Sequence, residues 1–388
     1  MKKKLLARKV FVLIKWFSIF GIIFVLGGCA SYLYLTQKDI FLISKSPYLG
    51  FVSEVYDVIK DNYWNKLTDK ELSVLFKSAA EQLGKKALFF PSENKKGVLL
   101  MLNTILSSME DQQKKEFVIQ LADLVLKNLP PAGRSSLYAT KEQKELTQMV
   151  ENINPDTGKK EPTILSQTIS SKTPGQKPAS VLTPEILYLR LQRFSSTTLT
   201  EFQEEADKAD KIKTLNTLIL DLRGNIGGSI DILPYFLGPF IGYNQYAYEF
   251  FSQGEHIPFK TKTGWLPSLV RYKKVIVLID ENTQSTAELF ASVLKKYNVG
   301  VLVGRKTKGW GTVERVFPIK QQIDPNETYS VFLVHSLTLR EDGKPIEGNG
   351  VEPTISIDAP DWKEQLFLYF HWKELADVVE KVWQHPPF

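Results

Sequence analysis

A serine that follows a predicted buried strand is the first residue in this sequence that could do chemistry. Ser285 lies in the stretch ENTQSTAE, directly after the apolar run VIVLID. At the entry to a helix, an oxygen nucleophile gains from nearby backbone N–H groups and from the helix dipole. The same spacing, Ser285 followed three residues later by Glu288, is also a capping box in which the serine is only the N-cap. The spacing alone leaves both interpretations open.

A glycine-rich turn is the second candidate. The stretch DLRGNIGG covers Asp221 to Gly228 and ends the apolar run NTLILDL. Glycines allow a backbone to approach a ligand closely and to turn N–H groups toward it. Sites in α/β sheets gather at the carboxyl ends of strands, where both stretches are predicted to lie. A plain strand-to-helix turn would use the same glycines, so this motif alone also stays open.

The elements that must position these residues alternate between strand and helix from Pro184 onward. The apolar runs ILYLRLQRF, NTLILDL, VIVLID and VGVLVGRK are predicted strands, and TLTEFQEEADKADKIK and STAELFASVLKKY are predicted helices. SIDILPYFLGPFIG is a predicted helix broken by Pro239. ERVFPIK and YSVFLVHSLTLR are predicted antiparallel strands, and one helix is predicted from Trp362 to Val382. This alternation indicates an α/β fold with a parallel or mixed sheet.

The part of the chain before this core divides into two predicted regions. Residues 46–153 show helical spacing, as in FVSEVYDVIKDNYW, GVLLMLNTILSSM and EFVIQLADLVLKNL, with a further helix from Thr140 to Val150. Residues 154–182 are rich in proline and poor in aromatic residues, which predicts a linker. Residues 183–388 then form the predicted α/β domain.

The N-terminal residues 1–36 predict a membrane attachment. Six basic residues without an acid precede the uncharged stretch Trp16 to Leu35, which is just long enough to span a bilayer as a helix. The positive charges predict a single-pass anchor with the N-terminus in the cytoplasm and the body outside the cell membrane. The stretch LGGC also has the look of a lipobox, so a lipoprotein attached through Cys29 is the alternative.

Composition excludes several classes of function. The net charge of +6 is carried by the basic N-terminus, so the body is neutral and no nucleic-acid partner is expected. Cys29 is the only cysteine, and the four histidines have no metal-ligand spacing. No metal and no cofactor are therefore expected.

Four motifs in order resemble one family, the carboxyl-terminal processing peptidases, also called tail-specific proteases. DLRGNIGG, TQSTAE, VGRKTKGWGTVE and PIEGNGVEP correspond to that family's DLRxNxGG, its serine three residues before a glutamate, its TFGKGxVQ and its late G(I/V)xP. The resemblance implies a crotonase-like (ClpP/crotonase-type) mixed-sheet serine peptidase core acting on protein or peptide substrates. It also implies Ser285 as nucleophile and an oxyanion hole formed by the backbone N–H groups of Gly227 and Thr286.

The sequence departs from the family at the base. Trp310 stands at the position of the family's catalytic lysine, and Glu314 at the position of the glutamine that orients it. An indole N–H only donates, so Trp310 is not a base. Lys308, two residues earlier, is the candidate for a displaced base with Glu314 as its orienting residue. Glu314 itself, His256 and His335 are further candidates.

A second departure is that the linker 154–182 stands in place of the PDZ module that this family usually carries. Two functions therefore remain open at the sequence level. The first is an active, membrane-tethered serine endopeptidase that cleaves exported proteins. The second is an inactive relative that binds peptides or acts as a scaffold.

Overall fold

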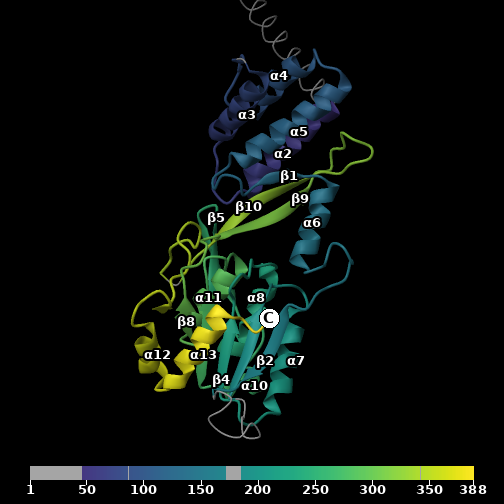
Figure 1. Ribbon diagram of the computed structural model, residues 1–388. Helices are drawn as coiled ribbons and strands as arrows, with labels where there is room; N and C mark the ends of the chain where they lie inside the picture. Colours follow the sequence, from purple (N-terminus) through teal and green to yellow (C-terminus); the bar gives the residue numbers. More distant parts are fainter. Residues whose placement is uncertain (1–45, 86, 172–184, 341) are drawn as a thin grey trace, which may run out of the picture. The chain divides into compact units, whose positions relative to one another are not determined.

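The computed structural model describes residues 46–85, 87–171, 185–340 and 342–388. Their contacts divide them into two compact units (Figure 1). One unit is helical and comprises, among the described residues, 46–60, 67–128 and 319–328. The other comprises residues 61–66, 129–318 and 329–388 and contains both sheets. The predicted anchor, residues 1–36, lies outside the described residues, and none of the described helices is long and apolar enough to cross a bilayer.

The described part of the helical unit contains four helices, within the region that the sequence predicts to be helical. They are α2 (Pro47–Asn62), α3 (Asp69–Gly84), α4 (Lys95–Leu106) and α5 (Asp111–Lys127). Val52, Val55 and Ile59 lie on one face of α2 and are fully buried, because residues three and four apart share a helix face. Thr68 caps α3 in a capping box with Glu71. The prediction of a helical N-terminal region is confirmed.

A six-stranded sheet forms the centre of the larger unit. Its order is β11-β8-β7-β4-β3-β2, and all neighbours are parallel except β2 and β3. The strands are β2 (Ile164–Ile169), β3 (Ile186–Leu191), β4 (Thr217–Asp221), β7 (Lys274–Ile279), β8 (Val301–Gly304) and β11 (Ile355–Ser356). The four apolar runs predicted as strands are β3, β4, β7 and β8, so the prediction of a mixed α/β sheet is confirmed.

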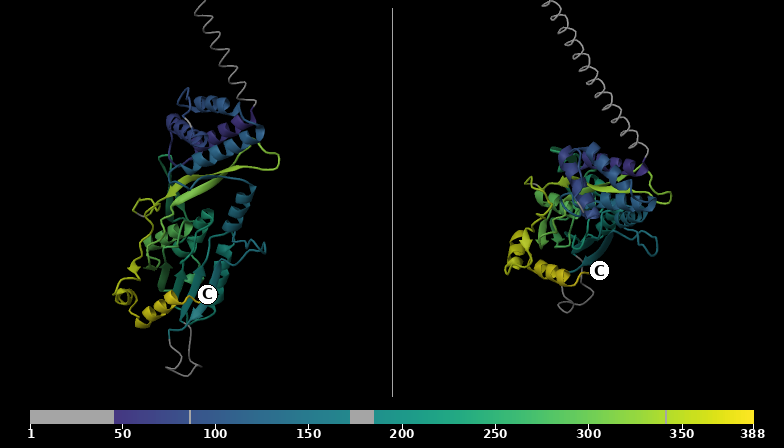
Figure 2. Two further views of the ribbon diagram at one scale, coloured as in Figure 1. Left: turned by 45° about the horizontal axis from the view of Figure 1, so that its top comes forward. Right: turned by 90° about the horizontal axis from the view of Figure 1, so that it is seen from above.

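Helices cover both faces of this sheet, which explains why its strands are continuously apolar. Leu187 and Leu189 of β3 pack on the face that carries α7 (Thr198–Asp210), α8 (Leu233–Phe236), α9 (Gly238–Ile241) and α11 (Thr286–Lys296). Ile186 and Tyr188 belong to the buried cluster on the other face, together with residues of α12 (Trp362–Phe370) and α13 (Lys373–Gln384). Figure 2 shows these two C-terminal helices in yellow. The 3₁₀ turn η2 (Ile230–Ile232) precedes α8.

Two sequence predictions are corrected here. The segment predicted as a linker contains β2, which pairs antiparallel with β3 along its whole length. The single C-terminal helix predicted from Trp362 to Val382 is two helices, because His371 adopts a left-handed conformation with φ of 50° between them. Residues 172–182 of the predicted linker lie outside the described residues.

An antiparallel sheet completes the larger unit. It contains β1 (Ser136–Tyr138), β5 (Tyr246–Ser252), β6 (Glu255–Lys260), β9 (Thr312–Pro318) and β10 (Ser330–Thr338). β10 pairs with β1, β5 and β9, and β6 pairs with β5. The two segments predicted as antiparallel strands are β9 and β10, and they pair with each other. The helix predicted over Thr140 to Val150 is α6, with the same bounds.

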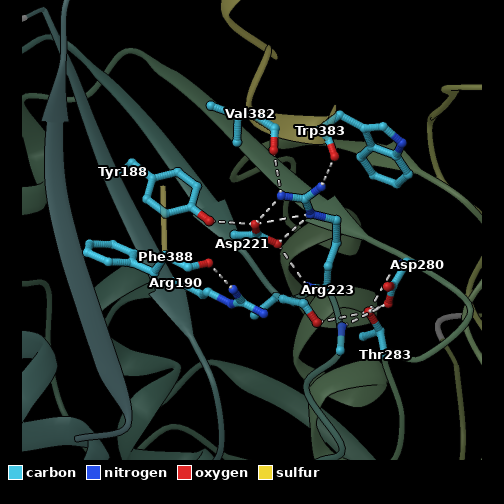
Figure 3. Close-up of polar contacts among 11 residues, drawn as sticks. Tyr188, Arg190, Asp221, Arg223, Asp280, Thr283, Val382, Trp383 and Phe388 are labelled. Atoms are coloured by element: carbon cyan, nitrogen blue, oxygen red, sulfur yellow. Dashed lines mark hydrogen bonds and ion pairs between the residues drawn. The ribbon is translucent and has the colours of Figure 1, made fainter. Parts of the chain in front are cut away.

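Arg223 fastens the C-terminal helix α13 to the sheet. Its guanidinium forms an ion pair with Asp221, at 2.6 Å between Nη2 and Oδ2, and donates to the carbonyl oxygens of Val382 and Trp383 (Figure 3). The hydroxyl of Tyr188 donates to the same carboxylate at 2.7 Å. Asp221 is 1 % exposed, so this pair is buried. Two residues of the DLRGNIGG motif therefore have a structural role.

We expect Arg223→Ala to destabilise the protein by about 3–5 kcal/mol, since it leaves the Asp221 carboxylate buried without its counter-charge. Arg305→Ala is the matched control, because Arg305 pairs with Asp358 and Glu281 at the exposed surface and should contribute little. Urea unfolding measures both. Equal, small changes in the free energy of unfolding would contradict the structural role of Arg223.

Candidate active site

The glycine turn and the serine turn lie side by side because they follow neighbouring parallel strands, β4 and β7. Four hydrogen bonds of 2.9 to 3.0 Å join the two turns: Gly224 N–H to Asp280 Oδ1, Thr283 Oγ1 to the Leu222 carbonyl, Gln284 N–H to the Asn225 carbonyl, and Thr286 Oγ1 to the Gly228 carbonyl. The sequence expectation that both motifs meet at one edge of the sheet therefore agrees with their placement.

Ser285 has a backbone conformation that a capping serine does not need. It is the N-cap of α11, and its N–H donates to the Glu288 carboxylate at 2.9 Å. Its φ and ψ are 57° and −127°, whereas an ordinary N-cap lies in the extended region. Such a conformation costs about 1–3 kcal/mol for a residue with a side chain and is typical of functional turns. Capping alone does not account for this strain.

Gly227 lies directly against the Ser285 side chain. A Cβ placed on Gly227 would come within 2.8 Å of Ser285 Cβ and 3.1 Å of Ser285 Oγ. The φ of Gly227 is 90°, which also favours glycine. The turn therefore leaves space for the serine hydroxyl only because residue 227 has no side chain.

The two amides that the sequence suggests for an oxyanion hole differ in their bonding. The N–H of Gly227 donates to Oδ1 of Asn225 at 2.8 Å. Asn225 is fully buried, and its Nδ2 donates to the carbonyl of Leu191 at 2.7 Å. Within the described part of the chain, the N–H of Thr286 has no hydrogen-bond partner. Only the Thr286 amide is therefore available to a ligand in this conformation.

Glu288 joins the serine turn to the segment that carries Trp310. Its buried carboxylate accepts hydrogen bonds from the N–H groups of Ser285, Gly309 and Trp310 and from the hydroxyl of Thr307. The Ser285 and Trp310 nitrogens bond the same oxygen, at 2.9 and 2.8 Å, so they lie within about 6 Å of each other. Burial raises the pKa of Glu288, and the hydrogen bonds oppose that shift.

Trp310 and Glu314 contact each other at the base position. The indole Nε1 of Trp310 donates to Oε1 of Glu314 at 3.3 Å, and Thr312 Oγ1 donates to the same oxygen at 2.5 Å. The guanidinium of Arg134 lies 3.4 Å from the centre of the Trp310 ring and is paired with Glu347 at 3.0 Å. Burial raises the pKa of Glu314. The position therefore holds a hydrogen-bond donor that cannot take a proton.

The other candidate bases lie at different distances from the serine turn. The N–H of Lys308 donates to the carbonyl of Thr283 at 3.1 Å, so its backbone adjoins that turn. Its side chain is exposed, with Nζ 5.8 Å from the centre of the Trp310 ring. His256 pairs with Glu249 on β5, and His335 contacts Ser336 on β10. Among the contacts of the described residues, neither histidine touches Ser285.

Sequence reasoning missed Asn225 and Arg134. Asn225 belongs to the DLRGNIGG motif, and its place between Gly224 and Gly227 was the signal in the sequence for a role in ordering that turn. Arg134 gave no such signal, because its contacts with Trp310 and Glu347 join residues far apart in the sequence.

Comparisons with known proteins agree with the motifs. Residues 185–357 match the model of Peptidase family S41. The carboxy-terminal processing protease CtpA of Bacillus subtilis (strain 168) is 28% identical over 182 residues, which are 46% of this chain and 36% of that protein. A carboxy-terminal-processing protease of Bartonella bacilliformis is 28% identical over 180 residues, which are 45% of this chain and 39% of that protein.

Among solved structures, a photosystem II D1 C-terminal processing protease aligns with a TM-score of 0.49 at 14% identity, over 81% of this chain and 93% of that chain. The chain spans little more than a third of the length of the two curated relatives named above. On the family match and these relatives, residues 185–357 belong to peptidase family S41, and the chain is a homologue of the CtpA-like C-terminal processing proteases.

Proposed function

We propose that the chain is a serine endopeptidase that cleaves peptide bonds in exported proteins, with Ser285 as nucleophile. The observation that carries this proposal is the conformation of Ser285, with φ of 57°, pressed against a glycine that leaves room for its hydroxyl. A serine kept only to cap α11 would relax into the extended region and lose this strain.

The reaction would follow ordinary acyl transfer. Ser285 Oγ attacks the substrate carbonyl carbon as its proton passes to a base, and the carbonyl oxygen becomes an oxyanion. The N–H of Thr286 would stabilise that oxyanion, and the N–H of Gly227 would join it once Asn225 Oδ1 gives way. The base then returns the proton to the leaving amine, and water releases the acyl group by the same steps.

Lys308 is the base that we propose. Its backbone adjoins the serine turn, and its side chain passes over the Trp310 ring. A lysine acts as a base only when neutral, and burial is what favours the neutral form. Because the side chain is exposed here, a bound peptide would have to cover it. Glu314 would act as the orienting residue indirectly. It accepts a hydrogen bond from the indole N–H of Trp310, and the Trp310 ring in turn lies beside the Lys308 side chain.

The predicted anchor implies where in the cell the protein acts. Residues 1–36 would tether the chain to the cell membrane, either as a single span or as a lipoprotein through Cys29, with the α/β unit outside the cytoplasm. Its substrates would then be exported or membrane-bound proteins.

A second function is favoured by the base position. Trp310 occupies it, Glu314 and Arg134 hold the indole in place, and Asn225 engages the Gly227 amide. A chain with these features would bind peptides without turnover, as an inactive relative. Peptide would then add to a sheet edge near Ser285 by backbone pairing.

For the peptidase, we expect the full chain in a mild detergent to cleave unfolded casein and Ser285→Ala to abolish cleavage. Lys308→Ala should lower kcat by about 10²–10⁴-fold, the usual contribution of a general base. Lys306→Ala is the matched control, since Lys306 is exposed in the same segment and pairs with Glu352. Cleavage products are followed by mass spectrometry. Full activity in Lys308→Ala would reject the displaced base, and no cleavage by the wild-type chain, with peptide binding retained, would favour the second function.

Glu314→Gln restores the family residue and removes a half-buried acid. The raised pKa means that the folded state binds this proton more tightly than the unfolded state, so the contribution of Glu314 to stability is lost as pH rises through the raised pKa. Glutamine has no such loss. We therefore expect Glu314→Gln to raise the Tm relative to wild type more at pH 8 than at pH 5.

Thermal unfolding at both pH values measures this effect, with Glu352→Gln, an exposed residue, as the control. If the difference in Tm between Glu314→Gln and the wild type is the same at pH 5 and pH 8, the pKa of Glu314 is not raised by its burial.

A further inference from the structure

The most exposed large apolar side chain among the described residues belongs to the helical unit. Phe89 is 85% exposed, and the next most exposed, Leu368, is 69% exposed. Phe89 belongs to residues 87–94, which lie between α3 and α4 and which we call the Phe89 loop. Its neighbours Leu88 and Phe90 are half-buried. A single exposed apolar side chain is ordinary at a protein surface, so its exposure alone indicates no function.

Hydrogen bonds at both ends hold the Phe89 loop in place. The N–H of Leu88 donates to Oε1 of Glu81 on α3 at 3.0 Å. At the other end, Asn94 is the N-cap of α4, and its Oδ1 accepts from the N–H of Gly97 at 3.0 Å. The loop is therefore ordered on both sides of Phe89, and it presents this side chain to the surroundings.

Positive charge surrounds the loop. Lys85 at the end of α3 and Lys96 in the first turn of α4 are both exposed, and neither forms an ion pair within the part of the chain that the structure describes. Glu93, the acid inside the loop, is paired with Lys70 at 3.0 Å. An apolar side chain among basic ones is typical of segments that enter the interface of a bilayer with anionic lipids.

The proposed anchor would keep the helical unit close to a bilayer. The eleven residues 36–46 join the predicted span to α2, and they can extend over at most about 36–40 Å. The longest helix in the described part of the unit, α5, has 17 residues and is about 26 Å long, so every face of the unit can reach the bilayer. Attachment through Cys29 would leave a longer tether. Because a tether raises the effective concentration, even a weak second contact would be occupied.

We propose that the Phe89 loop inserts into the interface of a bilayer that contains anionic phospholipid. Phe89 would be buried among the first carbons of the acyl chains, and Lys85 and Lys96 would contact lipid phosphates. The contact would orient the helical unit on the membrane. This inference rests on the proposed anchor but not on peptidase activity, because the loop contains no residue of the serine turn or the glycine turn.

Photochemical cross-linking tests the contact. The full chain is reconstituted into vesicles of phosphatidylcholine and phosphatidylglycerol with p-benzoyl-phenylalanine at position 89, which bonds to nearby C–H groups on illumination. Mass spectrometry measures the fraction of the chain that is linked to lipid. The matched controls carry the same residue in place of Val74 on α3 or Leu368 on α12, both exposed. We expect the yield at position 89 to be about fivefold higher than at either control. Equal yields at all three positions would overturn the proposal, since exposure alone would explain them.

Lys96→Glu tests the role of the charge. It should lower the yield at position 89 about twofold to fivefold in the mixed vesicles and leave it unchanged in phosphatidylcholine alone. Glutamate is favourable in the first turn of a helix, so α4 should stay folded. Lys127→Glu makes the same change at an exposed position of α5 and should have no effect. Equal effects of the two substitutions would contradict a contact between this loop and anionic lipid.

Extraction with alkaline carbonate followed by vesicle flotation tests the anchor separately. If the chain floats with the vesicles but position 89 gives no lipid cross-link, the anchor is retained and the loop contact is rejected. If the chain neither floats nor cross-links, both are rejected. Cross-links at position 89 in a chain that carbonate removes would support the loop contact and reject the anchor.

Discussion

One buried carboxylate holds the two halves of the candidate site together. Glu288 accepts hydrogen bonds from the Ser285 amide on one side and from Thr307, Gly309 and Trp310 on the other. Burial disfavours the charged form of Glu288 and raises its pKa, and the hydrogen bonds from these donors oppose that effect. The carboxylate in turn provides the acceptor that the buried donors need. Its partners are three backbone amides and a threonine hydroxyl, and none of them is the side chain of residue 310. The scaffold can therefore keep its geometry while the chemistry at that position changes.

The change at position 310 preserves a hydrogen bond and removes a base. In the family pattern a lysine at this position is oriented by a glutamine four residues later; here a tryptophan donates to a glutamate. Donor and acceptor stay in place, but the lone pair of the indole nitrogen belongs to the aromatic ring and cannot take a proton. Arg134 stacks on the ring and offsets part of the charge of Glu314. The strained Ser285 therefore favours a peptidase, whereas Trp310 at the base position favours an inactive relative. A peptidase is compatible with Trp310 only if another residue is the base, and Lys308 is the one that we propose.

Most of the fold could be predicted from the sequence because the central strands are buried on both faces and so are continuously apolar. β2 was missed because ILSQTI is an edge strand within a proline-rich, polar segment and only Ile164 is buried in it. The break between α12 and α13 was missed because His371, with φ of 50°, is neither glycine nor proline. The meeting of Ser285 with the glycine turn could be expected because both stretches follow buried strands of an α/β sheet, where sites gather at the carboxyl ends. The bond of Asn225 to the Gly227 amide did not, since it depends on one side-chain conformation.

In the proposed peptidase, Ser285 works as a nucleophile without a base at position 310. Labelling with a fluorophosphonate tests it directly, because this reagent bonds to the oxygen of an activated serine and releases fluoride. We expect peptide mapping of the wild-type chain to find the phosphonyl group on Ser285, and Ser285→Ala to remove it. Labelling of Trp310→Lys together with an unlabelled wild-type chain would contradict this role of Ser285, since the serine would then be active only when the family lysine is restored.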